Sequence, residues 1–173
     1  MRSGGSRVRD NALMMRDTVV AVIGQGAPES GAEVAAAEAV GAGLARAGAA
    51  LVTGGMGGVM AAASRGARRL GGRVIAVVPG ADRREARAPA DAVVASGVGE
   101  ARDLAVVASA DAVIAIGGGW GTLAEIGLAR KLGRPVVLLR SWELRPPGGG
   151  DAPGCLNAET PEQAVALALE AAP

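Results

Sequence analysis

The chain has 173 residues, enough for one domain with an apolar core, and its 18 basic and 17 acidic side chains nearly cancel. Attraction to nucleic acid or to an anionic membrane is therefore not expected, and no apolar run reaches the roughly 18 residues that cross a bilayer. The sequence has no histidine and one cysteine, which excludes histidine-based triads, His-ligated metals, internal disulfides and thiolate zinc clusters. We expect a cytoplasmic protein without a metal site, in which acid–base chemistry depends on carboxylates.

The chain begins with a segment that has no secondary-structure pattern. Residues 1–16 mix Arg, Gly, Ser and Asp without periodicity, so we expect a disordered tail before a single domain over residues 17–173. The β-branched run at residues 18–23 predicts a buried strand, and the following Gly-Gln-Gly at residues 24–26 predicts a tight turn.

Helices and short apolar strands alternate from there to the end of the chain. Ser30 and Glu33 form a capping box for a first helix, which Gly48 ends. The later elements are expected as strand 50–53, helix 59–70, strand 73–78, strand 92–95, helix 100–109, strand 112–116, helix 122–132, strand 136–139 and a final helix capped by Thr160 and ending near 171. Residues 141–157, rich in Pro and Gly, are expected to form a surface loop. The alternation predicts an α/β fold: a Rossmann-like, doubly wound parallel sheet in three αβα layers.

Three glycine loops follow strands, at residues 24–26, 54–58 and 117–121. Because the carboxyl ends of parallel strands meet at one edge of a sheet, all three loops are expected at that edge, where such folds bind ligands. Glycines allow the backbone to approach an anion, and the free N–H groups of the following helix point toward it. The pattern predicts a phosphate site.

The third loop is followed by Thr122 and Glu125, and this pair has two interpretations. Thr and Glu at this spacing form a capping box, in which each side chain accepts from a backbone N–H. Alternatively, Glu125 lies about one turn behind a bound phosphate, where a ribose joined to that phosphate would lie. The spacing alone favours neither.

Two further residues stand out near these loops. Arg102 is expected in the first turn of its helix, where the dipole disfavours a cation, and this hints at an anion nearby, although Glu100 and Asp103 are available as local partners. Trp120 either stacks on a ligand ring or packs the loop against a neighbouring helix.

Common nucleotide motifs fit the chain poorly. After the first strand the dinucleotide fingerprint fails, and Gly119, Gly121 and Ala124 match only its looser form, without a ribose-binding acid at the usual distance. A Walker A loop is absent, since Lys131 has no preceding G-x-x-x-x-G.

Three segments, at residues 53–60, 102–112 and 118–125, resemble the LOG-type family of the SLOG superfamily. Characterised LOG-type proteins are Rossmann-like nucleoside 5′-monophosphate phosphoribohydrolases, and the third segment is similar to their P-G-G-x-G-T-x-x-E motif. The resemblance implies that Arg102 and Glu125 are the catalytic pair. We expect the phosphate and nucleotide to be bound by Gly24, Gly26, Gly54, Gly55, Gly57, Met60, Gly118, Gly119, Trp120, Gly121 and Thr122.

Two departures from the family pattern point to a smaller branch. Gly117 replaces the Pro, and Asp103 follows Arg102 where the active enzymes have Lys; both changes resemble the branch that includes molybdenum-cofactor carrier proteins. The leading hypothesis is hydrolysis of a nucleoside 5′-monophosphate to free base and ribose 5-phosphate, with no cofactor required. The alternative is a carrier that binds molybdenum cofactor or a related phosphorylated ligand unchanged. The resemblance also implies a homo-oligomer, dimer or tetramer, in which the Ala-rich helix at residues 59–66 packs against a symmetry mate.

Overall fold

The computed structural model describes residues 18–27 and 31–173. Its elements, in chain order, are β1 (Val19–Gly24), α1 (Gly31–Arg46), β2 (Ala50–Thr53), α2 (Gly58–Arg69), β3 (Val74–Val78), the 3-10 turn η1 (Arg83–Glu85), β4 (Ala92–Ala95), the 3-10 turn η2 (Gly99–Ala101), α3 (Arg102–Ala108), β5 (Ala112–Ile116), α4 (Trp120–Lys131), β6 (Val136–Leu139), β7 (Cys155–Ala158) and α5 (Pro161–Ala171). The expected disordered tail and Ser30 lie outside the described residues.

The strands form one parallel sheet in the order β4-β3-β2-β1-β5-β6-β7. From β1 the chain moves outward through β2 and β3 to β4, and α3 then returns it to the other side of β1, where β5 pairs. The order of the strands therefore reverses between β1 and β5, and ligands of doubly wound sheets bind at the carboxyl ends of the strands at such a point.

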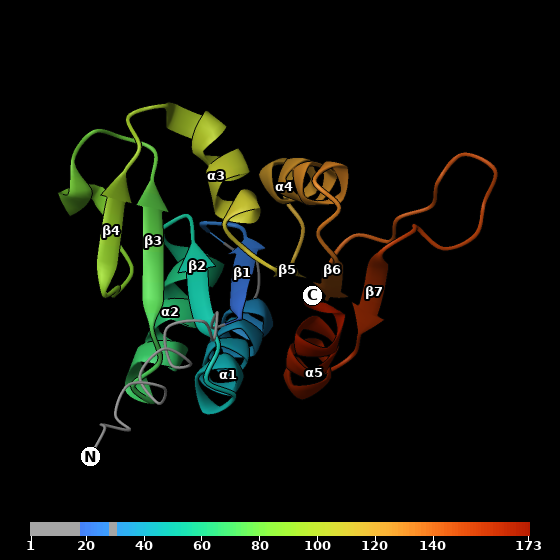
Figure 1. The fold of residues 1–173 in the computed structure, drawn as a ribbon, viewed down its shortest axis with the longest axis horizontal. Coiled ribbons are helices and arrows are strands. Elements are labelled where there is room, and N and C mark those ends of the chain that lie inside the picture. Colours follow the sequence, from blue (N-terminus) through green and yellow to red (C-terminus); the bar gives the residue numbers. More distant parts are fainter. Residues whose placement is uncertain (1–17, 28–30) are drawn as a thin grey trace, which may run out of the picture.

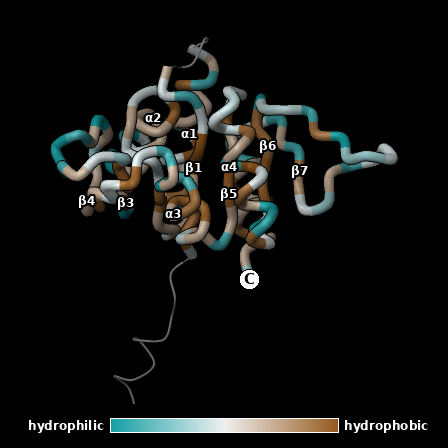
Figure 2. The backbone as a smooth tube through the Cα atoms, turned by 90° about the horizontal axis from the view of Figure 1, so that it is seen from above, coloured by the Kyte–Doolittle hydropathy of each residue, from teal (hydrophilic) through white to brown (hydrophobic). Residues whose placement is uncertain are grey.

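Helices cover both faces of the sheet, as Figure 1 shows. One apolar cluster joins α1, α2 and α5 to alternate strand residues such as Val20 and Ile114, and a second joins α3 and α4 to the intervening residues such as Ala21 and Val113. Strands buried on both faces are apolar along their whole length, and β1, β5 and β6 are coloured hydrophobic in Figure 2. The predicted three-layer Rossmann-like fold is confirmed.

The helices α1 and α2 cross at unusually close range because glycines lie at the crossing. A Cβ on Gly41 would overlap the Ala63 carbonyl oxygen, and a Cβ on Gly66 would overlap the carbonyl oxygen of Glu38. The small residues of α2 are thus buried within the chain itself. The expectation that residues 59–66 pack against a symmetry mate is wrong, because α1 already covers them.

The structure differs from the sequence prediction mainly near the C-terminus. The expected loop at residues 141–157 ends in an additional strand, β7, which pairs with β6 from Val136–Cys155 to Leu139–Ala158. The segment before β7 extends away from the sheet in Figure 1. Helix α4 begins at Trp120, two residues earlier than expected. No helix in the described part of the chain is long and apolar enough to span a membrane.

Candidate functional site

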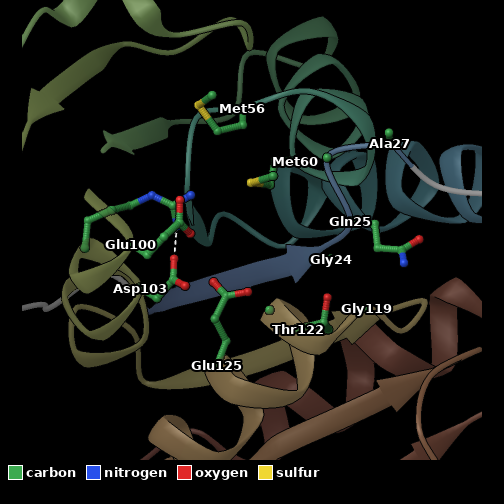
Figure 3. Close-up of a pocket in the computed structure, with 13 residues that line it drawn as sticks. Gly24, Gln25, Ala27, Met56, Met60, Glu100, Asp103, Gly119, Thr122 and Glu125 are labelled. Carbon is green, nitrogen blue, oxygen red and sulfur yellow. Dashed lines mark hydrogen bonds and ion pairs between the residues drawn. The ribbon is translucent and has the colours of Figure 1, made fainter. Parts of the chain in front are cut away.

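A cavity of about 390 Å³ opens at the carboxyl edge of the sheet, beside the ends of β1 and β5 (Figure 3). Four regions contribute to it: the loop after β1, the start of α2, the first turn of α3 and the first turn of α4. The described lining residues are Gly24, Gln25, Gly26, Ala27, Met56, Met60, Glu100, Arg102, Asp103, Gly119, Gly121, Thr122 and Glu125. The site therefore lies where the reversal of strand order predicts a ligand.

The loop after β1 is held against α2 by backbone contacts that require glycine. A Cβ on Gly24 would lie 2.5 Å from the Ile116 carbonyl oxygen and 2.6 Å from Cγ1 of Val59. The Val59 N–H donates to the Gln25 carbonyl at 3.0 Å. Backbone from two parts of the chain therefore packs together at this side of the cavity.

The N-terminus of α4 forms a second wall and has the geometry of an anion site. Its N-cap is Gly119, and no side chain caps the helix. The uncapped N–H groups and the helix dipole favour a negative charge at Gly119, Gly121 and Thr122, all of which line the cavity. Before the helix, Gly117 has a φ of 71°, which the fixed negative φ of proline excludes. This loop therefore differs in conformation from any loop with Pro at that position.

The start of α3 forms the opposite wall, where Arg102 and Asp103 make a buried ion pair through Nη1 and Oδ1. Arg102 is 6% exposed and Asp103 is 9% exposed. A Cβ on Gly54 would lie 2.9 Å from Nη1 of Arg102, so the glycine of the second loop makes room for the guanidinium. Asp103 thus neutralises the cation that the sequence assigned to catalysis.

Glu125 on α4 lies buried beside Asp103, and both carboxyl groups point into the cavity in Figure 3. Burial above all, and then the charge of Asp103, raise the pKa of Glu125 to about 8, although Arg102 opposes the rise. Burial also raises the pKa of Asp103, again against the effect of Arg102. Glu125 is therefore mostly protonated at neutral pH and able to donate a hydrogen bond.

The structure also decides between the two interpretations of Thr122 and Glu125. Because α4 begins at Trp120, Thr122 lies inside the first turn and does not occupy the N-cap position. Both residues are buried and line the cavity. The capping-box interpretation is therefore wrong, and Glu125 is available to a ligand.

Other residues singled out from the sequence lie near the cavity without lining it. Gly54 and Gly55 pack against Arg102 and Val78 respectively, and Gly57 packs against the carbonyl of Gly26. Gly118 lies beside the indole of Trp142. The sequence in turn missed Gln25, Ala27, Met56, Glu100 and Asp103 as cavity residues. Their only available signal was their position next to predicted glycine loops or next to Arg102.

Trp120 packs against the ring of a loop residue and not against a neighbouring helix, and stacking on a ligand ring stays a prediction. It is 79% exposed, and its ring lies 5.3 Å from that of Trp142 at an angle of 43°. Trp142 comes from the loop after β6 and donates weakly to the Gly119 carbonyl at 3.4 Å. These are the two aromatic residues of the whole sequence, and they lie together beside the N-terminus of α4.

Comparison with known proteins assigns the chain to a family. The model of the SLOG cluster4 family matches residues 17–166, so the chain belongs to that family. A protein of Archaeoglobus fulgidus, itself of uncharacterized function, is 41% identical over 115 residues, which are 66% of this chain and 71% of that protein.

Two solved structures are similar to this chain over almost their whole length. The molybdenum cofactor binding protein from Rippkaea orientalis has a TM-score of 0.79 and 31% identity, covering 90% of this chain and 98% of that one. The molybdenum cofactor carrier protein from Chlamydomonas reinhardtii has a TM-score of 0.76 and 31% identity, with the same coverage. The predicted resemblance to this branch of the SLOG proteins is confirmed.

Proposed function

We propose that the chain binds a small phosphorylated ligand of the molybdenum-cofactor class in the cavity between β1 and β5 and carries it unchanged. The observation that carries the proposal is the uncapped N-terminus of α4, which opens into the cavity at Gly119, Gly121 and Thr122. Backbone N–H groups and a hydroxyl are the donors that a phosphate requires. Similarity to two molybdenum-cofactor proteins over nearly their full length supports the choice of ligand.

The environment of Arg102 favours a carrier over a hydrolase. An enzyme that cleaves a glycosidic bond needs charge complementary to an oxocarbenium-like transition state, with free groups to hold the sugar and the departing base. Here Asp103 pairs with Nη1 of the guanidinium and offsets its charge, and Glu125 is mostly neutral at pH 7. The carrier interpretation is therefore better supported than the hydrolysis that the sequence placed first.

A pair of charge variants on α4 tests the phosphate site. A Cβ on Gly121 meets no atom within 4 Å, so Gly121→Glu adds a negative charge at the cavity without a steric clash. Gly127→Glu adds the same charge at an equally open position of the same helix, outside the lining residues. We expect Gly121→Glu to lower the affinity for molybdenum cofactor at least tenfold and Gly127→Glu to leave it unchanged, as measured by molybdenum retained per chain after gel filtration. Equal retention by both variants would contradict the proposal.

Nucleotide hydrolysis stays a second candidate because of one feature. A buried carboxyl whose pKa is about 8 retains its proton at neutral pH and suits a general acid for a departing base. If it acts so, release of free base from AMP, GMP or CMP is constant at acidic pH and falls as pH rises through about 8, and Glu125→Gln abolishes it. Absence of base release by the unmodified chain at pH 6 removes this candidate.

We also propose that the chain is a homo-oligomer. Val94 on the edge strand β4, Val98 after it and Leu104 on α3 are exposed apolar side chains in the same part of the chain. A symmetric contact between copies would cover them. Light scattering that gives the mass of a single chain at micromolar concentration would contradict this.

A further inference from the structure

A phosphate at the N-terminus of α4 accounts for the residues at one end of the cavity but not for the residues at the other end. Glu100, Asp103 and Glu125 gather at the α3 side, accompanied by a single cation, Arg102. An anion is favoured at the N-terminus of α4 and disfavoured beside these carboxyl groups. The two ends of the cavity therefore suit two chemically different ends of one ligand.

The carboxyl groups at the α3 end have hydrogen-bonding capacity that the protein does not use. Glu125 is 7% exposed, and none of the described residues hydrogen-bonds its carboxyl group. Asp103 uses Oδ1 for Arg102, while its other oxygen has no partner among the described residues. Both carboxyl groups line the open cavity, where water can hydrate them, and a ligand with complementary polar groups can take the place of that water.

The side of the cavity that faces these carboxyl groups is apolar and polarizable. Met56 and Met60 extend from the α2 side across from Asp103 and Glu125 in Figure 3. Thioether sulfur packs favourably against aromatic rings. The methionines suit the face of a flat ring, and the carboxyl groups suit polar groups along one edge of that ring.

We propose that the α3 end of the cavity recognises the 2-amino-4-oxopyrimidine edge that pterins and guanine share. Asp103 accepts from the ring N–H and the exocyclic amino group, and Glu125 donates to the adjacent carbonyl. This assignment rests on the proposed function, because a phosphate at α4 determines which end of the ligand reaches α3. The assignment accounts for discrimination among phosphorylated ligands, which the phosphate contacts do not provide.

The protonation states are consistent with these roles. Burial and the charge of Asp103 raise the pKa of Glu125 to about 8, so the carboxyl group is a donor at neutral pH. Burial raises the pKa of Asp103 on balance, and the Arg102 guanidinium at Oδ1 opposes that rise, so the ion pair is what supports the acceptor form of Asp103. The protein thus offers one hydrogen-bond donor, on Glu125, and two acceptor positions, on Asp103. Guanine complements this set with its carbonyl, its ring N–H and its amino group, whereas adenine has a ring acceptor where guanine has the N–H.

Four phosphorylated probes measure this specificity: GMP, IMP, AMP and neopterin monophosphate, with ribose 5-phosphate as a probe of the phosphate end alone. Calorimetry should give at least tenfold tighter binding of GMP than of AMP, and IMP, which lacks the amino group, should lie between them. Neopterin monophosphate should bind at least as tightly as GMP if the edge belongs to a pterin, and more weakly if it belongs to guanine. Equal affinities for GMP, IMP and AMP overturn the inference but leave the phosphate site standing. Failure of every probe, ribose 5-phosphate included, overturns the proposed function itself.

A variant of Asp103 tests the residue assignment. Asp103→Asn keeps the shape but replaces one acceptor with a donor, so GMP affinity should fall at least tenfold while ribose 5-phosphate affinity stays within twofold. Glu170→Gln is the matched control: Glu170 is exposed on α5, outside the residues that line the cavity, and its change should alter GMP affinity less than threefold. If Asp103→Asn weakens ribose 5-phosphate as much as GMP, Asp103 acts only by holding Arg102 in place, and the assignment is wrong.

Discussion

At the scale of single residues, the surroundings of Glu125 disfavour its ionised form and so destabilise the fold. Its carboxyl group is buried next to Asp103, and both the burial and the negative charge of Asp103 raise its pKa. In the unfolded chain the same group ionises with an ordinary pKa near 4.5. Such a group lowers the stability of the fold when the solution is neutral or alkaline, which is typical of residues kept for a ligand.

Glu125→Gln should therefore stabilise the protein in a pH-dependent way. Between pH 4.5 and about 8 the folded protein holds a proton that the unfolded chain releases, so the free energy of unfolding falls as pH rises. Gln does not titrate, and the variant should gain on the order of a few kcal/mol at pH 8 and nothing below pH 4. Urea denaturation of both proteins from pH 4 to 9 measures this difference. Parallel curves over that range would mean that Glu125 is already ionised in the fold.

Replacing Gly54 with Ala is predicted to weaken ligand binding by displacing side chains at the cavity, Arg102 among them. In Gly54→Ala the new methyl group would lie 2.9 Å from both Nη1 of Arg102 and Sδ of Met60, so these two side chains must shift. Because a flexible side chain gives way, we expect stability to fall by about 1 kcal/mol or less, while GMP affinity falls several-fold. Gly127→Ala, at an open position of α4, should leave affinity unchanged. Unaltered binding by Gly54→Ala would show that the position of Arg102 does not matter to the ligand.

The sequence revealed part of the site because backbone and charge leave a pattern there. The glycines of the third loop, with Thr122 and Glu125 at fixed offsets, predict an anion site and an adjacent acid, and two of these glycines, Gly119 and Gly121, line one cavity with Thr122 and Glu125. Gln25 and Met56 were not predicted, since a loop side chain reaches the cavity through the tertiary fold and not through any periodicity. The position of Trp120 depends on Trp142, 22 residues away in the sequence, which no local pattern connects to it.

At the scale of elements, glycine decides how α1 and α2 pack. Their backbones approach closely at Gly41 and Gly66, and this packing places Met60, near the N-terminus of α2, at the cavity. Five helices and all strands but one were predictable, because fully buried strands are continuous apolar runs. The exception, β7, has the sequence Cys-Leu-Asn-Ala, lies at the edge of the sheet and follows a Gly- and Pro-rich segment, so its pairing with β6 has no sequence signature.

Gly41→Ala should weaken the crossing of α1 and α2. The added methyl group would overlap the Ala63 backbone, which cannot rotate away, so the helices must separate. We expect a loss of roughly 2–3 kcal/mol in the free energy of unfolding. Gly127→Ala is the control: at an exposed helix position with open space, alanine should add about 0.5–1 kcal/mol. A gain of stability in Gly41→Ala, measured by the same urea titration, would contradict the close packing.

At the scale of the whole molecule, the reversal of strand order between β1 and β5 brings the separate parts of the site together. It places the loop after β1 beside the N-terminus of α4, and the crossover through α3 brings Arg102 and Asp103 to the opposite wall. Membership of the SLOG cluster4 family and similarity to molybdenum-cofactor proteins support a small-molecule ligand, and the cavity is the ground for placing it at this edge. The proposed carrier function needs a cavity that holds its cargo by both ends, and we propose that the N-terminus of α4 and the carboxyl groups near α3 are those two ends.

Crystals of the chain grown with molybdenum cofactor test this arrangement most directly, because the anomalous scattering of molybdenum marks the ligand independently of its shape. We predict a molybdenum peak in the cavity between β1 and β5, with the ligand phosphate within hydrogen-bonding distance of the backbone N–H groups of Gly121 and Thr122 and the pterin edge at Asp103. A ligand bound outside this cavity, or one whose phosphate lies away from the N-terminus of α4, would contradict the account.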